Sequence, residues 1–126
     1  MNPLLLIAAA LLVLIGLIHS ILGERLLLRR LLRPDRQPPL FGGNLLATRT
    51  LRFAWHVTTL AWWGFAALLV LLARGQPTVA ELAGVIGATF GVTGLVALIA
   101  SRGRHLSWIV FLAVAGLAAF VAWPSR

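Results

Sequence analysis

The chain contains no cysteine and no lysine, and it has only three acidic residues among its 126 positions. Without cysteine, disulfide bonds, thiol catalysis and thiolate metal sites are excluded. The sequence also has no HExxH motif, no pair of carboxylates and no glycine-rich phosphate loop. The sequence therefore offers no signature of a known enzyme chemistry, and whether the protein is an enzyme stays uncertain.

Charged residues make up only 11% of the chain, against about 25% in soluble domains. Apolar residues gather in four stretches without fixed charge, at residues 3–23, 53–73, 82–101 and 106–123. Each holds 18 to 21 residues, and a membrane-crossing helix needs about 20. The sequence thus predicts one all-α domain, an integral membrane antiparallel four-helix bundle. The first stretch lacks a basic flank and a small-residue cleavage site, so we expect it to be retained.

The eleven basic residues are all arginine and are unevenly distributed. Nine lie in the first connection, residues 24–52, or in the third, around residues 102–104. The positive-inside rule places these connections in the cytoplasm and both termini outside, which gives an N-out, C-out topology. The composition suggests a bacterial inner membrane. Because the arginines flank apolar stretches, we expect anionic lipid headgroups as partners and no nucleic acid.

Several local patterns refine the helices. Leucines and arginines after residue 23 predict an amphipathic extension of the first helix up to Pro34. The second helix is expected from about residue 45 to 73. Thr78 and Glu81 form a capping-box pattern before the third helix, which gives Glu81 a structural role. Trp55 suits an interfacial aromatic belt, whereas the indole of Trp63, near mid-span, is expected to face another helix.

The third stretch has a face of small residues, made by Gly84, Gly87, Gly91 and Gly94 at steps of three and four. In lipid, such a face allows close helix packing. Two interpretations are open. The glycines pack inside the bundle, or they form a seam between copies of the chain, in a homo-oligomer or a larger membrane complex. The second interpretation includes a small oligomeric transporter or channel.

Polar groups inside or beside the apolar stretches are the main functional signal, because ionisable side chains are costly there and often mark function. The expected topology gathers five of them near the cytoplasmic leaflet: His19, Glu24, Arg52, His56 and His105. His19 and Glu24 are five residues apart, about 140° around an α-helix. We therefore expect that these two side chains do not point at the same partner.

Three chemistries fit this set. His19 and His56 are candidate axial ligands of a haem, and together with Glu24 they are candidate ligands of a divalent metal. Arginines and histidines are also suited to a lipid headgroup or another anion. A purely structural alternative is that Glu24 and Arg52 lock the first helix to the second. We expect a small binding or accessory membrane protein with a His/Glu/Arg pocket. The alternatives are a membrane redox, metal or haem protein and the transporter described above.

Overall fold

The computed structural model describes residues 1–33 and 45–123, and for residues 45–47 it describes the backbone alone. These residues form α-helices and one π-helix, which confirms the all-α prediction. The elements are α1 (Pro3–Leu22), η1 (Gly23–Leu28), α2 (Arg29–Leu31), α3 (Leu45–Arg74), α4 (Val79–Ser101) and α5 (Ser107–Ala122). Because α1, η1 and α2 follow without a break, they form one rod, as expected for an extended first helix. Residues 34–44 of the predicted basic connection lie outside the described residues.

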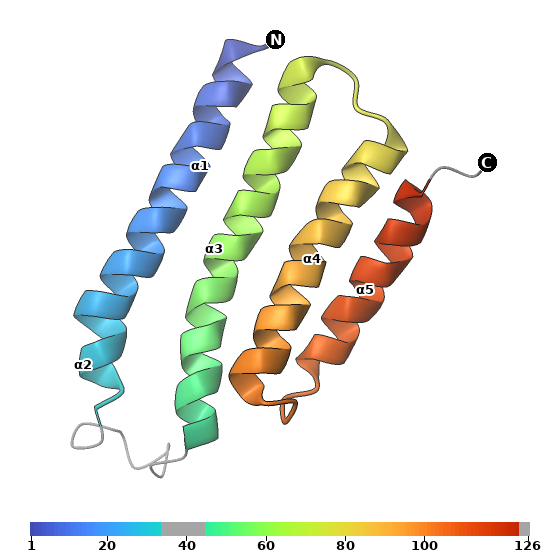
Figure 1. Ribbon diagram of the computed structural model, residues 1–126. Coiled ribbons are helices and arrows are strands. Elements are labelled where there is room, and N and C mark those ends of the chain that lie inside the picture. Colours follow the sequence, from blue (N-terminus) through green and yellow to red (C-terminus); the bar gives the residue numbers. More distant parts are fainter. Residues whose placement is uncertain (34–44, 124–126) are drawn as a thin grey trace.

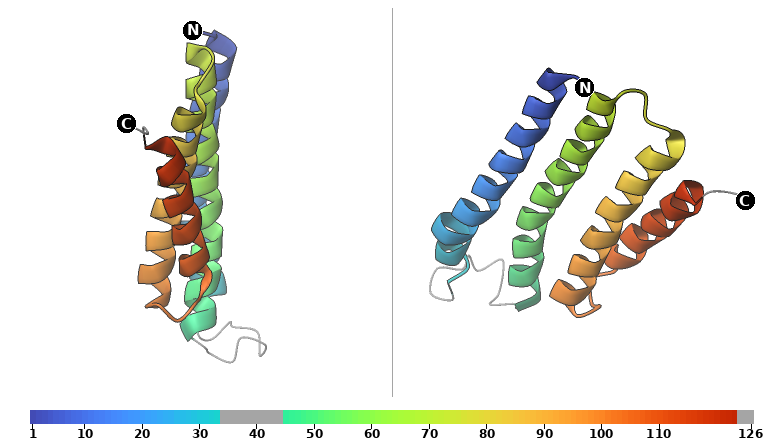
Figure 2. Two further views of the ribbon diagram at one scale, coloured as in Figure 1. Left: turned by 90° about the vertical axis from the view of Figure 1, so that its right-hand side faces the viewer. Right: turned by 45° about the horizontal axis from the view of Figure 1, so that its top comes forward.

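Consecutive rods run antiparallel and lie side by side in the order α1, α3, α4, α5 (Figure 1). Turned by 90°, the same helices form a narrow layer (Figure 2). α1 packs on α3, α3 on α4, and α4 on α5. The antiparallel order is as predicted, but the helices form an open layer and enclose no common interior. Each helix packs mainly against the helices next to it in this order, through the sides that face them.

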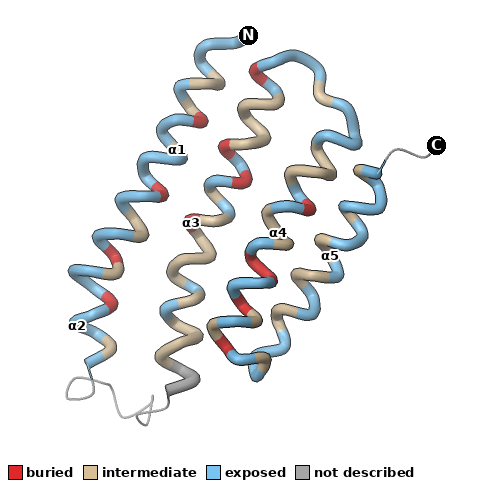
Figure 3. The backbone as a smooth tube through the Cα atoms, in the orientation of Figure 1, coloured by how far each residue is buried: buried red, intermediate tan, exposed pale blue. Residues whose placement is uncertain are grey.

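The buried positions lie along the lines where neighbouring helices meet (Figure 3). Among the residues whose burial the structure describes, the buried apolar ones are Ala9, Ala66, Ala73, Ala97 and one large residue, Leu28, which is 1% exposed. Large apolar side chains such as Leu11, Phe65 and Phe120 are exposed. This distribution is the reverse of that in a soluble domain. Small residues at helix contacts are the pattern of helices that associate in lipid.

Within residues 1–33 and 45–123, three helical segments are long and apolar enough to cross a membrane: Pro3–Leu31, Thr48–Arg74 and Val79–Ser101. The fourth, α5, has 16 residues, which span about 24 Å at 1.5 Å per residue. It is therefore shorter than the predicted stretch 106–123 and shorter than the ~30 Å hydrocarbon layer. Trp123 is already extended, with ψ 123°, because the residue before a proline disfavours the helical conformation.

The helix ends follow from specific side chains. Thr78 Oγ1 accepts the N–H of Glu81 at 3.2 Å, and the Glu81 carboxylate accepts the N–H of Thr78 at 2.8 Å. This pair confirms the predicted capping box of α4. α4 ends with Arg102 at φ 52° and Gly103 at φ 76°, two left-handed residues that turn the chain towards α5.

The glycine face of α4 lies against α5. A Cβ atom on Gly87 would lie 3.3 Å from the carbonyl oxygen of Ala115, and one on Gly94 would lie 2.8 Å from Leu112 Cδ2. Gly84 and Gly91 face alanine side chains of α5 at 3.9 and 3.7 Å. Since α5 occupies this face, the glycines pack two helices of the same chain.

Candidate functional site: a polar seam between α1 and α3

A ladder of hydrogen bonds joins α3 to the backbone of α1. Trp63 Nε1 donates to the carbonyl of Val13 at 3.3 Å, and Thr59 Oγ1 donates to that of Gly16 at 3.3 Å. Trp55 Nε1 donates to the carbonyl of His19 at 3.1 Å. The donors are four residues apart on α3 and the acceptors three apart on α1, so both sets lie on the facing sides. We call this contact the polar seam and define it by Val13, Gly16, His19, Ser20, Gly23, Glu24, Arg52, Trp55, His56, Thr59 and Trp63.

Two glycines allow the indoles to approach the α1 backbone. A Cβ on Gly16 would lie 2.6 Å from Trp63 Nε1, and a Cβ on Gly23 would collide with the indole of Trp55. A helical carbonyl has a second lone pair beyond its helix bond, so it can accept these N–H groups. The indole of Trp63 therefore faces another helix, as predicted. The indole of Trp55, assigned to an interfacial belt, instead has its N–H bonded inside the protein.

The imidazole of His19 is held on several sides. Its ring stacks on that of Trp55, with centroids 4.4 Å apart and an angle of 5° between the planes. The ring of Trp62 lies 5.0 Å away. His19 Nε2 lies 3.2 Å from the carbonyl oxygen of Trp55 and donates to it. Aromatic contact and the backbone bond thus fix the orientation of this ring.

The imidazole of His56 connects two parts of the seam. Its Nδ1 lies 2.8 Å from Ser20 Oγ, which in turn lies 3.0 Å from Thr59 Oγ1. Its Nε2 lies 3.5 Å from a carboxylate oxygen of Glu24, which makes an ion pair whenever the imidazole is protonated. A continuous polar chain therefore runs from Glu24 through His56 and Ser20 to Thr59.

The helix that carries Glu24 changes its winding from this point on. Gly23–Leu28 is a π-helix, in which the N–H of Arg29 bonds to the carbonyl of Glu24 five residues earlier. His19 and Glu24 take different partners, as expected: His19 contacts Trp55, whereas Glu24 contacts Arg52 and His56. Both side chains contact α3. The same winding brings Arg29 Nε within 3.6 Å of the Glu24 carboxylate.

The carboxylate of Glu24 is surrounded by positive charge. Arg52 Nε lies 3.1 Å from Glu24 Oε2, in addition to the contacts with Arg29 and His56. The buried Oε2 atom accepts no well-aligned hydrogen bond from the described residues, so the contact with Arg52 is an ion pair without hydrogen-bond geometry. One carboxylate thus faces two guanidinium groups and leaves net positive charge.

Further arginines lie at the same end of the molecule, where α2 ends, α3 begins and α4 turns into α5 (Figure 1). We call it the basic end and define it by the described residues Arg25, Arg29, Arg30, Arg33, Arg49, Arg52, Arg102 and Arg104. Of the acidic residues that the structure describes, Glu24 lies here and Glu81 caps α4 at the opposite end. The basic end is therefore strongly positive.

The structure brings together four of the five predicted site residues, His19, Glu24, Arg52 and His56, along successive turns of the seam. His105 is separate from them. Its Nδ1 lies 2.8 Å from Ser107 Oγ and accepts the N–H of Ser107 at 3.4 Å, at the beginning of α5. The sequence does not assign Trp55 to the site, and only its four-residue spacing from Thr59 and Trp63 hinted at a common face.

The seam offers no ready set of metal ligands. Across residues 1–33 and 45–123, no group of three or more histidine, cysteine, aspartate or glutamate side chains is arranged to hold a metal ion. A haem or metal on His19 and His56 would first have to displace the contacts that both imidazoles make with the protein.

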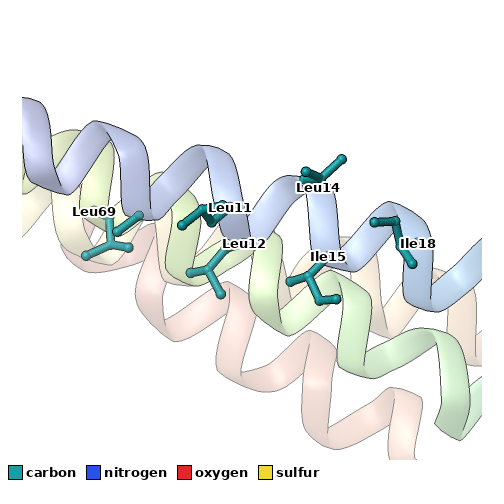
Figure 4. A pocket seen from close by; sticks show the side chains of 7 residues that line it. Leu11, Leu12, Leu14, Ile15, Ile18 and Leu69 are labelled. Atoms are coloured by element: carbon teal, nitrogen blue, oxygen red, sulfur yellow. The ribbon is translucent and has the colours of Figure 1, made fainter.

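A groove beside the seam is purely apolar. It has a volume of about 560 Å³ and is lined by aliphatic side chains of α1 together with Leu69 of α3 (Figure 4). The labelled α1 side chains are Leu11, Leu12, Leu14, Ile15 and Ile18. The groove therefore offers almost no polar group that could orient a substrate.

No protein-family model matches this chain, no curated protein resembles it significantly, and no solved structure matches its fold.

Proposed function

We propose that this chain is a multi-pass membrane protein of the binding or accessory type, which holds an anionic ligand or partner at its basic end. The supporting observation is the environment of Glu24. Its single carboxylate faces Arg29, Arg52 and His56, so the seam positions more positive charge than it neutralises. Such an excess on ordered helices attracts anions and orients them.

The exposed apolar surface supports membrane placement. Three long apolar helices, small residues at the helix contacts and large ones outside all suit lipid as the surrounding solvent. The short α5 would cross with local thinning of the bilayer, at a modest cost per ångström of mismatch. The arginine distribution favours a cytoplasmic basic end with both termini outside, in a bacterial inner membrane.

The absence of cysteine makes the topology directly testable. Single-cysteine variants Arg30→Cys, Gln76→Cys, Arg104→Cys and Trp123→Cys each carry one label site, all at exposed positions. A membrane-impermeant maleimide added to spheroplasts should label the variants at 76 and 123, and label the other two only after lysis. Labelling of positions 30 and 76 from the same side would refute the crossing scheme. Labelling of positions 104 and 123 from the same side would remove the α5 crossing alone.

Anion binding is tested with lipid nanodiscs that contain phosphatidylglycerol and phosphatidylcholine. Native mass spectrometry reports the anionic lipid retained by the protein. Arg52→Gln should lower retention about fivefold, because one arginine near an anionic surface contributes about 1 kcal/mol. Arg74→Gln removes the same charge at the opposite end of α3 and serves as the matched control. Equal retention in both variants, with the fold intact by tryptophan fluorescence, would contradict the proposal.

The two alternative functions predicted from the sequence have no specific contact among the described residues in their support. A redox, metal or haem protein using His19 and His56 would reveal itself by a visible absorption band or by bound metal in the purified protein. A transporter with a seam along α4 would require the glycine face that α5 covers. Ion flux into proteoliposomes would nevertheless revive that function.

A further inference from the structure

A small cavity lies between the beginning of α3, the end of α4 and the beginning of α5. Its volume is about 10 Å³, which corresponds to about one water-sized sphere. Its lining combines the apolar residues Phe53, Ala97 and Ala100 with residues that carry polar side chains, namely Arg49, Thr50, Ser101, His105 and Ser107. The α4–α5 turn and the beginning of α3 meet at the same end in Figure 1. The cavity is on the other side of α3 from the polar seam.

The hydroxyl of Ser101 is unusual for a serine near the end of a helix. Ser101 is 8% exposed, and its buried Oγ has no hydrogen-bond partner among the described residues. On the same helix, Thr89 and Thr93 each donate to the carbonyl four residues earlier at 2.8 Å. Burying a hydroxyl without a partner costs about 1–3 kcal/mol. An unpaired hydroxyl that lines a cavity therefore indicates a missing partner.

The charges around the cavity indicate what kind of partner is missing. Arg49 and His105 line it, and Arg102 and Arg104 lie in the adjoining turn. Every ion pair found among residues 1–33 and 45–123 involves Glu24, on the seam side of α3. The amino-terminal end of α5 adds the positive end of a helix dipole. The cavity thus combines a buried donor with uncompensated positive charge.

We propose that this cavity receives one oxygen of a phosphate group, with Arg49 and His105 holding the remaining oxygens at its mouth. A whole phosphate is too large for about 10 Å³, but a single oxygen fits and can accept the Ser101 hydroxyl hydrogen. The headgroup of an anionic phospholipid and free inorganic phosphate share this chemistry. The lipid source rests on the proposed function, because it requires the basic end to lie at the headgroups.

The test compares variants in the nanodisc assay and, in parallel, binding of inorganic phosphate by calorimetry in detergent. Ser101→Ala removes the hydroxyl without changing charge and should lower phosphate-group binding about fivefold, the equivalent of one hydrogen bond. Arg49→Gln should lower it at least as much. Thr93→Ala and Arg74→Gln remove a hydroxyl and an arginine outside the basic end and should leave binding unchanged. Arg30→Gln, at the basic end but away from the cavity, measures diffuse electrostatic attraction. Ser101→Thr keeps a hydroxyl but fills the cavity with a methyl group, so it should also reduce binding and serves if Ser101→Ala does not fold.

The outcomes separate the possibilities. If the Ser101 and Arg49 variants lose binding in the nanodisc assay alone, the ligand is a lipid headgroup. If they also lose binding of inorganic phosphate in the calorimetry, a free phosphate is sufficient to occupy the site. Unchanged binding in the Ser101 variants would overturn the proposal and leave the cavity to a water molecule. Equal losses for Arg49→Gln and Arg30→Gln without an effect at Ser101 would show diffuse attraction and would also overturn it. Lipid retention by the Arg52→Gln variant tests the proposed function separately, because Arg52 lies in the polar seam and does not line this cavity.

Discussion

Replacing Gly23 with alanine should disrupt the polar seam more than any other single methyl group. The α-carbon of Gly23 lies directly against the indole of Trp55, so a Cβ atom has no space there. That indole is fixed by its hydrogen bond to the carbonyl of His19 at 3.1 Å and by stacking on the His19 ring at 4.4 Å. The alanine therefore forces Trp55 away from both contacts.

The expected magnitude follows from these contacts. Overpacking of this kind costs about 1–3 kcal/mol. The lost indole hydrogen bond adds about 1 kcal/mol, and the lost stacking adds about 0.5–1.5 kcal/mol. The higher helix propensity of alanine than of glycine offsets about 0.5–1 kcal/mol of this loss. We therefore expect Gly23→Ala to lower the free energy of unfolding by roughly 1.5–5 kcal/mol.

Unfolding by SDS in mixed micelles, followed by tryptophan fluorescence, measures this difference. Gly116→Ala is the matched control, because a Cβ there has no neighbouring atom within 4 Å. It should leave stability unchanged or raise it by up to about 1 kcal/mol. If Gly23→Ala proved as stable as the parent protein, the close contact between η1 and α3 would be wrong. Equal destabilisation by both variants would show that the loss does not arise at Trp55.

Three further predictions use the same unfolding assay. Gly64→Ala should cost about 1–3 kcal/mol, because its Cβ would lie 2.6 Å from Thr89 Oγ1; adding Thr89→Ala should recover part of the loss, and strict additivity would contradict the contact. Thr78→Ala should cost about 0.5–2 kcal/mol through the lost helix cap, with Thr78→Ser retaining most of the stability if the cap is the cause. Ser20→Ala should cost about 1–3 kcal/mol because it leaves His56 Nδ1 without its partner at 2.8 Å, and no change would mean that the polar chain through His56 does not stabilise the fold.

The helices could be predicted because their signals are local. Four apolar stretches mark the four rods, and a threonine followed three residues later by a glutamate marks the beginning of α4. The close packing on Gly87 and Gly94 also follows a local three-and-four spacing. In each case the relevant residues lie within one helix, so their period is visible in the sequence.

The site depends on features without a local signal. The π-helix at Gly23–Leu28 brings Arg29 to the carboxylate of Glu24, and Trp55 packs against Gly23, the first residue of this helix. The open layer is likewise a matter of which helix sides meet. The separation of His105 follows from it, since α3 lies between the seam and α5 (Figure 1). None of these relations is encoded in the spacing of residues along one helix.

The polar seam also explains why indoles and hydroxyls, which are costly to bury, occur in helices that are otherwise apolar. Two smooth aliphatic helices in lipid have little preference for one register over another, because lipid tails are as apolar as leucine. Donors at Trp55, Thr59 and Trp63 meet the carbonyls of His19, Gly16 and Val13 in one register only. A shift by one turn would leave several of these donors without their carbonyl partners, at a cost of about 1–3 kcal/mol for each one that stays buried. Register therefore accounts for the indoles and hydroxyls, but it does not require the surplus of arginines at the basic end. The surplus of arginines has no role in fixing the register, which favours a binding function for the basic end.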